Sequence, residues 1–581
     1  MASDNQLARL RAVVQDSLGK HLFENAIFFA DKLVTLSRGD PDDVYRLAQT
    51  FVFTKQHRRA LHVLNKTKQA TATSRFRYLT AKCLAECQEL DECLALLDDA
   101  ALKAVAAEEA ASGGGDGQVR MLAAMQLLRG SVFESQENWP LAARCYTAAL
   151  HADALCYEAL DRLVHNHMIS TGEQRSLLAE LEPRLQGADN EWLLLYYRCK
   201  LEPEQGKLLA DAYDAHPLPA DGEEEEELET GHAGGALDGD AASSGVLVRL
   251  RNNCDMLTAA AEYAYSHEHF RKCYALSCRV LQQDPFQKHV LPVHVCSMMR
   301  LDYHAELFFL AHQLVEEYPS AAVSWYAVGC YYHMIGDFEN ARRYFSKATT
   351  IDHRFAPAWV GFGHAFAAQD ESDQAMAAYR TASRLFPGSH IPWLGIGMEY
   401  LRTNHLHLAL QYIKQAQQIC PVEPLVLHEL GVLHYLNAEY DEAIKYFRQV
   451  AESCHEYDET VREPSIFNLA HAYRKTRDFD NAAHWYRAAL AINPRVASTY
   501  SALGFTLHLK GDLDAAIELY HQSLSLKPDD TFTCEMLSEA LKDTLELPDV
   551  NDLGGMGGAG PSGSAGPSRA GSAASSAMDI Q

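Results

Sequence analysis

The sequence predicts an all-α fold, a superhelical solenoid of about twelve to fourteen helix pairs. A helix-like segment recurs along the chain, its apolar residues follow a helical period, and glycine and proline recur at matching places. The segment "GDFENARRYFSKA" begins at position 336, and related copies begin at 370, 404, 438, 477 and 511. Because a fixed repeat of about 34 residues is typical of stacked helix-turn-helix units, these copies predict a solenoid.

Each copy is expected to contain two antiparallel helices that pack through small residues. A Trp and a Gly lie on one face of the first helix, and an Ala lies on one face of the second. We expect the Gly to lie against the Ala, because closely packed backbones need small side chains there. A proline after the second helix would end it, since proline lacks an N–H. The repeated structural positions are Trp325, Gly329, Ala341, Trp359, Gly363, Ala375, Trp393, Gly397, Ala409, Gly431, Ala443, Ala482, Gly504 and Ala516.

Weaker copies extend the repeat toward the N-terminus. The position of the second-helix alanine is predicted at Ala26, Ala60, Ala142, Cys273 and Leu307. Residues 1–103, 119–202 and 247–321 are therefore expected to continue the array, and 322–547 to form a C-terminal superhelix with a peptide groove. Residues 104–118 read as a Gly-rich loop, 203–246 as an acidic low-complexity insert and 548–581 as a disordered Gly/Ser/Ala/Pro tail. Five extra residues within 452–464 are expected to lengthen one inter-helix turn.

Composition restricts the class of protein. The 581-residue chain carries a formal net charge of −27, which argues against nucleic-acid binding. Its apolar runs fall short of the ~20 residues that span a bilayer, and its N-terminus lacks a signal-peptide apolar block. The 14 cysteines form no C-x-x-C pair and read as core residues of a reducing compartment.

No motif predicts catalysis, a cofactor or a metal site. A phosphate-binding G-x-x-x-x-G-K-[ST] is absent from the sequence, and His428-Glu429 lacks the second histidine of H-E-x-x-H. The pairs His165/His167 and His405/His407 are two residues apart, so on a helix they point away from each other. We therefore expect no enzyme activity and no bound cofactor.

A ligand is expected on the inner face, which the first helix of each unit lines in a curved helical array. The face opposite the packed stripe is rich in aromatic, Met and Arg side chains, the types enriched at binding hot spots. An extended peptide in this groove is the preferred interpretation, although any single histidine is more simply a solvated residue. The predicted groove residues are Tyr326, His333, His364, Met398, Arg402, His428, Tyr435, Phe467, His471, Arg474, Phe505 and His508.

The repeat pattern is that of tetratricopeptide repeats, and the residues between the repeated positions resemble one family in particular. Segments such as "RYLTAKCLAEC" (77–87), "LLRGSVFESQENWPLAARCYTAAL" (127–150) and "YPSAAVSWYAVGCYYHMIG" (318–336) are similar to the Cdc16-type sixth subunit of the anaphase-promoting complex, or cyclosome. The similarity runs from about residue 7 to 540, interrupted at the two low-complexity inserts.

The resemblance implies a non-catalytic scaffold in a ubiquitin ligase that acts in mitosis, in the nucleus and cytoplasm. It implies a homodimer formed through the N-terminal repeats, contacts with other repeat subunits, and a C-terminal superhelix enclosing the N-terminal peptide of a small Cdc26-type subunit. Two features depart from the family: the sequence contains no Ser-Pro or Thr-Pro dipeptide, and the acidic insert has no dependable counterpart.

Three other interpretations are weaker. A co-chaperone that binds acidic C-terminal peptides needs a two-carboxylate clamp of Lys, Asn and Arg, and Asn468 alone does not make one. An adaptor of another complex would use the same groove. A glycosyltransferase with a repeat arm would need a catalytic domain, but the repeats reach about residue 530 and the tail has low complexity.

Overall fold

The computed structural model describes residues 4–71, 73–112, 120–185, 190–201, 250, 252–266, 269–421, 423–453 and 459–546. Within these ranges the chain forms 29 helices and no strand, which confirms the all-α prediction. None of the helices in these ranges has the length and apolar character that a membrane crossing requires. The predicted insert at 203–246 and tail at 548–581 lie outside the described residues.

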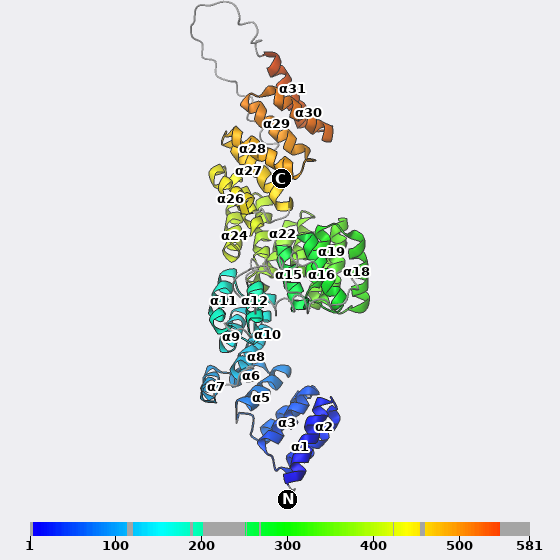
Figure 1. Ribbon diagram of the computed structural model, residues 1–581, viewed down its shortest axis with the longest axis vertical. Helices are drawn as coiled ribbons and strands as arrows, with labels where there is room; N and C mark the ends of the chain where they lie inside the picture. The colour runs from blue at the N-terminus through cyan, green and yellow to red at the C-terminus, as the bar shows by residue number, and fades with distance from the viewer. Residues whose placement is uncertain are drawn as a thin grey trace, which may run out of the picture. The chain divides into compact units, whose positions relative to one another are not determined.

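The chain divides into two compact units, and the first contains the helices up to residue 201. Most helices that follow one another in the chain pack against each other (Figure 1). The helices of this first unit are α1 (Asp4–Gly19), α2 (Phe23–Leu36), α3 (Pro41–Phe53), α4 (His57–Lys66), α5 (Ser74–Glu86), α6 (Leu90–Leu96), α7 (Asp99–Ser112), α8 (Met121–Ser135), α9 (Trp139–Ala152), α10 (Tyr157–His165), α11 (Thr171–Leu185) and α12 (Glu191–Leu201).

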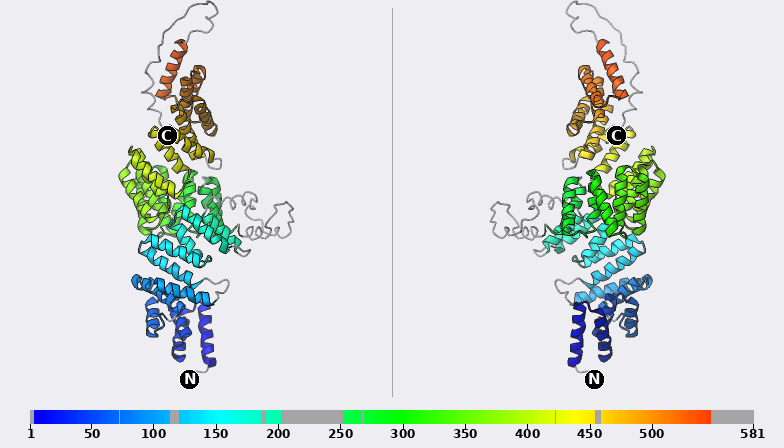
Figure 2. Two further views of the ribbon diagram at one scale, coloured as in Figure 1. Left: turned by 90° about the vertical axis from the view of Figure 1, so that its left-hand side faces the viewer. Right: turned by 90° about the vertical axis from the view of Figure 1, so that its right-hand side faces the viewer.

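The second unit stacks helix pairs more regularly, and Figure 2 shows these pairs from two sides. Its helices are α15 (Cys254–Ser266), α16 (Phe270–Gln283), α17 (Leu291–Arg300), α18 (His304–Glu317), α19 (Ala322–Ile335), α20 (Phe338–Ile351), α21 (Ala356–Ala367), α22 (Ser372–Leu385), α23 (Ile391–Arg402), α24 (Leu406–Ile419), α25 (Pro424–Leu436), α26 (Tyr440–Ser453), α27 (Glu459–Lys475), α28 (Phe479–Ile492), α29 (Ala497–Lys510), α30 (Leu513–Leu526) and α31 (Thr531–Glu546).

Two predicted loops are partly helical. Helix α7 runs through Ser112, so residues 104–112 of the predicted loop at 104–118 are helix. Its sequence "AVAAEEAAS" explains this, because alanine and glutamate are strong helix formers. Helix α27 begins at Glu459 and carries Pro464 inside it, so the extra residues within 452–464 partly lengthen a first helix.

The residues predicted at the second-helix alanine position are fully buried. Ala341, Ala375, Ala409, Ala443, Ala482 and Ala516 are each 0% exposed, and so are Ala26, Ala60, Ala142, Cys273 and Leu307. The proline prediction also holds, since α22 ends at Leu385 before Pro387 and α24 at Ile419 before Pro421. The half-buried tryptophans hydrogen-bond to the same turns. Nε1 of Trp325 donates to the Pro319 carbonyl at 2.8 Å, and Nε1 of Trp359 donates to the His353 carbonyl at 3.0 Å.

The nearest neighbour of these glycines is a large side chain and not the predicted alanine. A Cβ placed on Gly329 would meet the Phe345 ring at 2.7 Å, and one on Gly363 would meet the Tyr379 ring at 2.3 Å. The glycine thus faces the large side chain sixteen residues later, and at Gly504 a Cβ would also meet the Ala516 carbonyl oxygen, at 3.3 Å. A flat ring needs an open backbone surface beneath it, and only glycine leaves that surface free.

In the described residues, the turns between the two helices of a pair use a left-handed residue. In the second unit these are Asp302, Gly336, Asp370, Asn404, Ala438, Arg477 and Gly511, with φ between 55° and 94°. Their spacing repeats the sequence period, including its one longer step. Only two of the seven are glycine, so the turn geometry is maintained even where the residue type does not favour it.

Candidate peptide-binding site

The predicted groove residues come from α19, α21, α23, α25, α27 and α29, the first helices of successive pairs. The structure places them in three environments. Six are buried: Tyr326, His428, Tyr435, Phe467, His471 and Arg474. Three are half-buried, His333, Phe505 and His508, and three are exposed, His364, Met398 and Arg402.

Most of the buried residues take part in packing between helices. The Tyr326 hydroxyl lies 3.1 Å from the Cys296 sulfur on α17, and His428 Nδ1 lies 2.7 Å from the Ser465 hydroxyl on α27. These contacts arise because first helices touch the first helices of neighbouring pairs, such as α17 with α19 and α25 with α27. The sequence pattern described one helix at a time and therefore missed this second contact.

His364 occupies an unusual position among the exposed residues. Its Nδ1 lies 2.7 Å from the Tyr379 hydroxyl, and surrounding protein desolvates the ring and lowers its pKa to about 4. The charges of His333 and Arg300 contribute to the same lowering. An imidazole that is open to solvent yet enclosed by protein suits the inner face of a stacked array, and it is neutral at pH 7.

Arg402 is fixed by its own chain. Its guanidinium donates to the Ala367 carbonyl at 3.0 Å, to the Ser372 hydroxyl at 2.7 Å and to the Glu399 carboxylate at 2.6 Å, and it also bonds Asp370. Glu399 is buried, so Arg402 compensates a carboxylate that would otherwise be unpaired. Arg402 therefore has a structural task that the sequence did not predict.

Other residues of the inner helices were not singled out from the sequence. Burial raises the pKa of Glu429, on α25, to about 7. Arg300 and Tyr265 lie next to Cys296, and the Cys296 charge and burial raise the pKa of Tyr265. Glu429 stands among apolar residues in "LVLHELGVL", which is the one sequence signal that favours a desolvated carboxyl group.

The remaining half-buried residues join neighbouring helices. His333 packs edge-on against Phe338, and His508 Nε2 lies 2.9 Å from the Asp543 carboxylate. Phe505 packs edge-on against Phe532 of α31 and carries the Arg474 guanidinium 5.1 Å from its ring centre. The last pairs of the array are thus linked through polar as well as apolar contacts.

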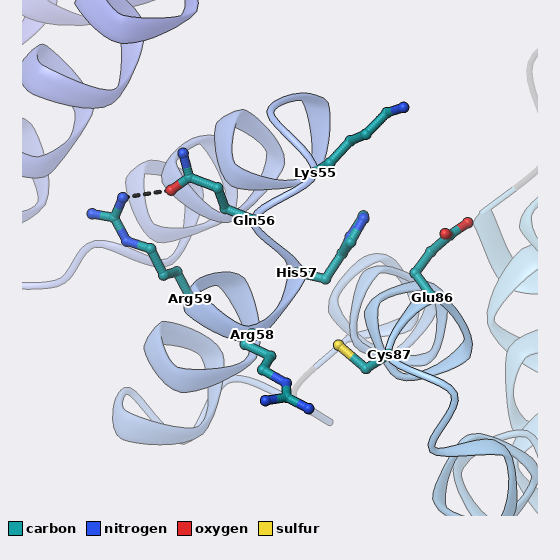
Figure 3. Close-up of a pocket in the computed structure, with 7 residues that line it drawn as sticks. All are labelled: Lys55, Gln56, His57, Arg58, Arg59, Glu86 and Cys87. Atoms are coloured by element: carbon teal, nitrogen blue, oxygen red, sulfur yellow. Dashed lines mark hydrogen bonds between the residues drawn. The ribbon is translucent and has the colours of Figure 1, made fainter.

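A second hollow lies in the first unit, between the start of α4 and the end of α5 (Figure 3). It has a volume of about 620 Å³ and is lined by Lys55, Gln56, His57, Arg58, Arg59, Glu86 and Cys87. Figure 3 shows Arg59 turned away from Glu86 and Cys87, with its guanidinium hydrogen-bonded to Gln56 at 2.5 Å. The hollow is basic but shallow, and its arginines do not converge on one point.

No constellation for catalysis emerges in the described part of the chain. Groups of three or more His, Cys, Asp or Glu side chains able to hold a metal ion are absent from these residues. The cysteines are predominantly core residues, as predicted: burial raises the pKa of Cys83 and Cys273 to about 12. Such thiols stay protonated and unreactive at neutral pH.

Comparison with known proteins agrees with the architecture. A family model described as "Anaphase-promoting complex, cyclosome, subunit 3" matches residues 19–100. Models described as "Tetratricopeptide repeat" match residues 322–353, 425–456 and 467–531. The repeat models thus match the second unit, and the subunit 3 model matches the first.

Curated relatives match almost from end to end. The chain is 42% identical over 549 residues to "Anaphase-promoting complex subunit 6" of Arabidopsis thaliana, covering 93% of this chain and 97% of that protein. It is 36% identical over 553 residues to "Cell division cycle protein 16 homolog" of Homo sapiens, covering 92% and 84%. Among solved structures, the "Crystal structure of APC/C hetero-tetramer Cut9-Hcn1" aligns with a TM-score of 0.71 and 29% identity, covering 93% of this chain and 97% of that one.

Proposed function

Because this chain belongs to the family of anaphase-promoting complex subunit 6, or Cdc16, we propose that it is a non-catalytic scaffold subunit of an anaphase-promoting complex ubiquitin ligase. The observation that carries the proposal is the 42% identity that extends over 97% of the Arabidopsis subunit. A match of that length includes the surfaces between repeats as well as the repeats themselves. Other repeat subunits of the complex are the proposed partners, and the nucleus and cytoplasm the proposed location.

The proposed scaffold is a homodimer that uses the N-terminal repeats. The first unit exposes large apolar side chains near its start, which supports this part of the proposal. Leu22 is 50% exposed, Phe28 58% and Phe53 53%. Phe28 lies on α2 with Lys32 5.3 Å from its ring centre, so the patch has a charged rim. Exposed large apolar side chains in one unit favour a protein partner, here a second copy of the chain.

The proposed scaffold also binds the N-terminal peptide of a small partner subunit along the first helices of residues 322–547. Hcn1 is named together with Cut9 in the solved hetero-tetramer, and it serves as the model for such a partner. Met398, 39% exposed, His364 and Arg402 are the predicted groove residues that are exposed. Met and His side chains adapt to varied peptide surfaces at low cost.

Affinity purification of the tagged chain followed by mass spectrometry tests the scaffold proposal. We expect a cullin-like chain, a RING-type protein and further repeat subunits among the co-purifying proteins. Recovery of a chaperone alone would overturn the proposal in favour of the co-chaperone interpretation.

The dimer is tested by light scattering on the full chain. We expect a mass of twice 64.7 kDa for the wild type and of one chain for Phe28→Glu. Phe309→Glu is the matched control, since Phe309 is an aromatic residue of the second unit with 70% exposure. If both variants stay dimeric, the α2 surface is not the dimer contact.

A further inference from the structure

Helix α4 lies in a strongly basic region of a chain that is acidic as a whole. The full sequence has 51 Lys and Arg against 78 Asp and Glu. Between Asp43 and Glu86, however, it has nine Lys and Arg and neither Asp nor Glu. This stretch forms most of α3, the whole of α4 and almost all of α5, and α4 packs against both of the other helices. Positive charge is therefore concentrated on these three helices of the first unit.

The basic residues of α4 form a row along its exposed face. The helix buries Ala60, Leu61 and Leu64 on one side. On the opposite side, every fourth residue is polar and exposed: Arg58, His62 and Lys66. Residues four apart on a helix share a face and lie about 6 Å apart along its axis. We call these three residues the α4 basic row, and its length is about 12 Å.

The chain does not neutralise the α4 basic row. Within the described residues, neither Arg58 nor Lys66 forms a salt bridge with a carboxylate. The Asp42 carboxylate, at the start of the neighbouring α3, is instead paired with Arg75 at 3.0 Å. Glu86 is the one carboxylate among the residues that line the hollow beside α4, and it lies at the end of α5. The row therefore presents its positive charge to solvent.

The hollow at the start of α4 continues this basic surface. Lys55 and Arg58 both line it, and Figure 3 shows their side chains spread apart with His57 between them. A single small anion such as phosphate is held best by donors that converge on one point, which these side chains do not do. Charges that are spread along a surface suit a ligand whose own charges are also spread.

We propose that the α4 basic row binds an extended acidic segment of a partner protein, with the carboxylates of alternate residues facing the row. In an extended chain every second side chain points to the same side, and such side chains lie about 7 Å apart. That spacing is close to the ~6 Å between neighbours in the row. A nucleic acid fits less well, because the net charge of −27 repels a phosphate polymer. This surface belongs to the first unit, whereas all the predicted groove residues belong to the second.

The first test measures the binding of an acidic peptide to the full chain by fluorescence anisotropy. The probe is a fluorescein-labelled peptide of alternating glutamate and serine, and its matched control has glutamine in place of glutamate. We expect the wild type to bind the glutamate peptide and not the glutamine peptide. Binding should weaken as salt rises from about 50 to about 300 mM, because salt screens exposed charges. A wild type that binds neither peptide at low salt would overturn the proposal.

Two double variants with equal changes of net charge test the position of the site. Arg58→Glu with Lys66→Glu reverses two charges of the row and should weaken binding at least about 10-fold. Arg343→Glu with Arg384→Glu is the matched control, since both arginines are exposed on second helices, α20 and α22. The control should bind within about twofold of the wild type, because salt screens charges that the ligand does not contact. An equal loss in both double variants would show attraction to net charge alone and overturn the site.

A photo-reactive form of the glutamate peptide locates the site directly. With benzophenone at its N-terminus it should cross-link to residues of α4 or α5, which mass spectrometry of the digested chain identifies. Cross-links confined to residues 322–547 would place the acidic peptide on the C-terminal repeats. That result would overturn the α4 site and leave the scaffold proposal intact.

Other occupants of the row give different results, and each would overturn the proposed partner. If light scattering shows that Arg58→Glu with Lys66→Glu changes the mass of the assembly, the row is a contact between copies of the chain. If the peptide binds only after the five glutamates at 223–227 are replaced by glutamine, the chain's own acidic run occupies the row. If a single-stranded oligonucleotide binds more tightly than the glutamate peptide, and the same double variant abolishes this, the ligand is a nucleic acid.

Discussion

The two units use the same helix-pair geometry but fill its central contact differently. In eleven helix pairs of the described residues, a small and a larger buried residue stand sixteen positions apart. The first unit uses Val14/Ala30, Ala48/Leu64, Ala81/Leu97 and Gly130/Tyr146, and the second unit Val295/Ala311, Gly329/Phe345, Gly363/Tyr379, Gly397/Ile413, Gly431/Phe447, Ala470/Tyr486 and Gly504/Tyr520. The pair of positions is maintained, while the residues that occupy it are not.

This difference shows that the combined size of two side chains matters more than either residue alone. The second unit favours the extreme combination, glycine beneath a large side chain, and the first unit mostly combines alanine with an aliphatic residue. Both fill the space between two helices at a density that interiors require. Val14/Ala30 and Val295/Ala311 place the larger residue on the first helix and still fit.

The units also differ in how they hold buried polar groups. Both units bury carboxylates beside arginine: Asp43 of the first unit, 0% exposed, accepts hydrogen bonds from Arg11 at 2.8 Å and from Arg46 at 2.9 Å, and Glu399 of the second accepts one from Arg402 at 2.6 Å. Among the described residues, only the second unit also buries imidazoles, and burial lowers the pKa of His294 and of His428 to about 4. The two units should therefore respond differently to packing changes and to acid.

The largest effect is expected where the small-large pair is most extreme. Gly363→Leu forces a side chain into the Tyr379 ring, whose nearest atom lies 2.3 Å from a Cβ at this position. Overpacking of this kind costs about 3 kcal/mol. Hydrogen exchange followed by mass spectrometry should show α21 and α22 opening more readily. Gly172→Leu in α11 is the control, since a Cβ there meets nothing within 4 Å. Equal protection in Gly363→Leu and wild type would contradict the assigned packing.

The next effect concerns acid and the second unit. The folded pKa of His428 is about 4, below the ordinary value of about 6.5, so the unfolded chain binds a proton first as the pH falls. His428 therefore contributes stability above about pH 6.5 that is lost as the pH falls toward 4. At pH 5 the loss is about 2 kcal/mol, from about 1.4 kcal/mol per pKa unit.

Comparing His428→Asn with the wild type at pH 7 and pH 5 isolates this contribution. Hydrogen exchange of α25 and α27 should be less sensitive to pH in the variant. Glu429 acts in the opposite direction, because a folded pKa raised to about 7 favours the folded state as the pH falls from 7 toward 4.5. Glu429→Gln should therefore make the same helices more acid-sensitive. Identical pH dependence in all three proteins would refute both assignments.

The sequence predicted the fold far better than it predicted the site. The repeat period and the alanine positions follow from a periodicity that local packing imposes on every pair, so Ala341 and its equivalents could be found without coordinates. The role of Gly363 could not be predicted in this way, because the ring that packs on it, Tyr379, lies on the other helix of the pair. The choice of groove residues was less accurate for the same reason. Tyr326 and His428 are buried by neighbouring pairs, which a pattern within one helix does not describe.

A smaller effect is expected for the buried carboxylate of the first unit. Burial alone would raise the pKa of Asp43, but hydrogen bonds and charge from Arg11 outweigh it and hold the pKa below its ordinary value. Asp43 thus contributes stability above about pH 4 that is lost as the pH falls through the lower folded pKa. Asp43→Asn should lower the free energy of unfolding of α1 and α3 by about 2 kcal/mol at pH 7. It should also remove the loss of their stability below pH 4. Protection of α1 and α3 that still falls below pH 4 in the variant would exclude Asp43 as the cause.

The smallest effect is a gain of stability at a turn that both units share. Ala438 adopts φ 61° between α25 and α26, the left-handed conformation that glycine takes at Gly336 and Gly511. Because a Cβ in this conformation is strained, Ala438→Gly should stabilise the pair by about 1 kcal/mol, even though glycine makes the unfolded chain more flexible. Gly336→Ala, at φ 85° with no neighbour within 4 Å, is the reverse experiment and should destabilise α19 and α20 by a similar amount. Opposite shifts in the melting temperature of the two variants would locate the strain in the turn itself. A loss of stability in Ala438→Gly would mean that the turn accommodates alanine without strain. The left-handed turn would then not restrict which residue occupies it, in contrast to the small-large pairs.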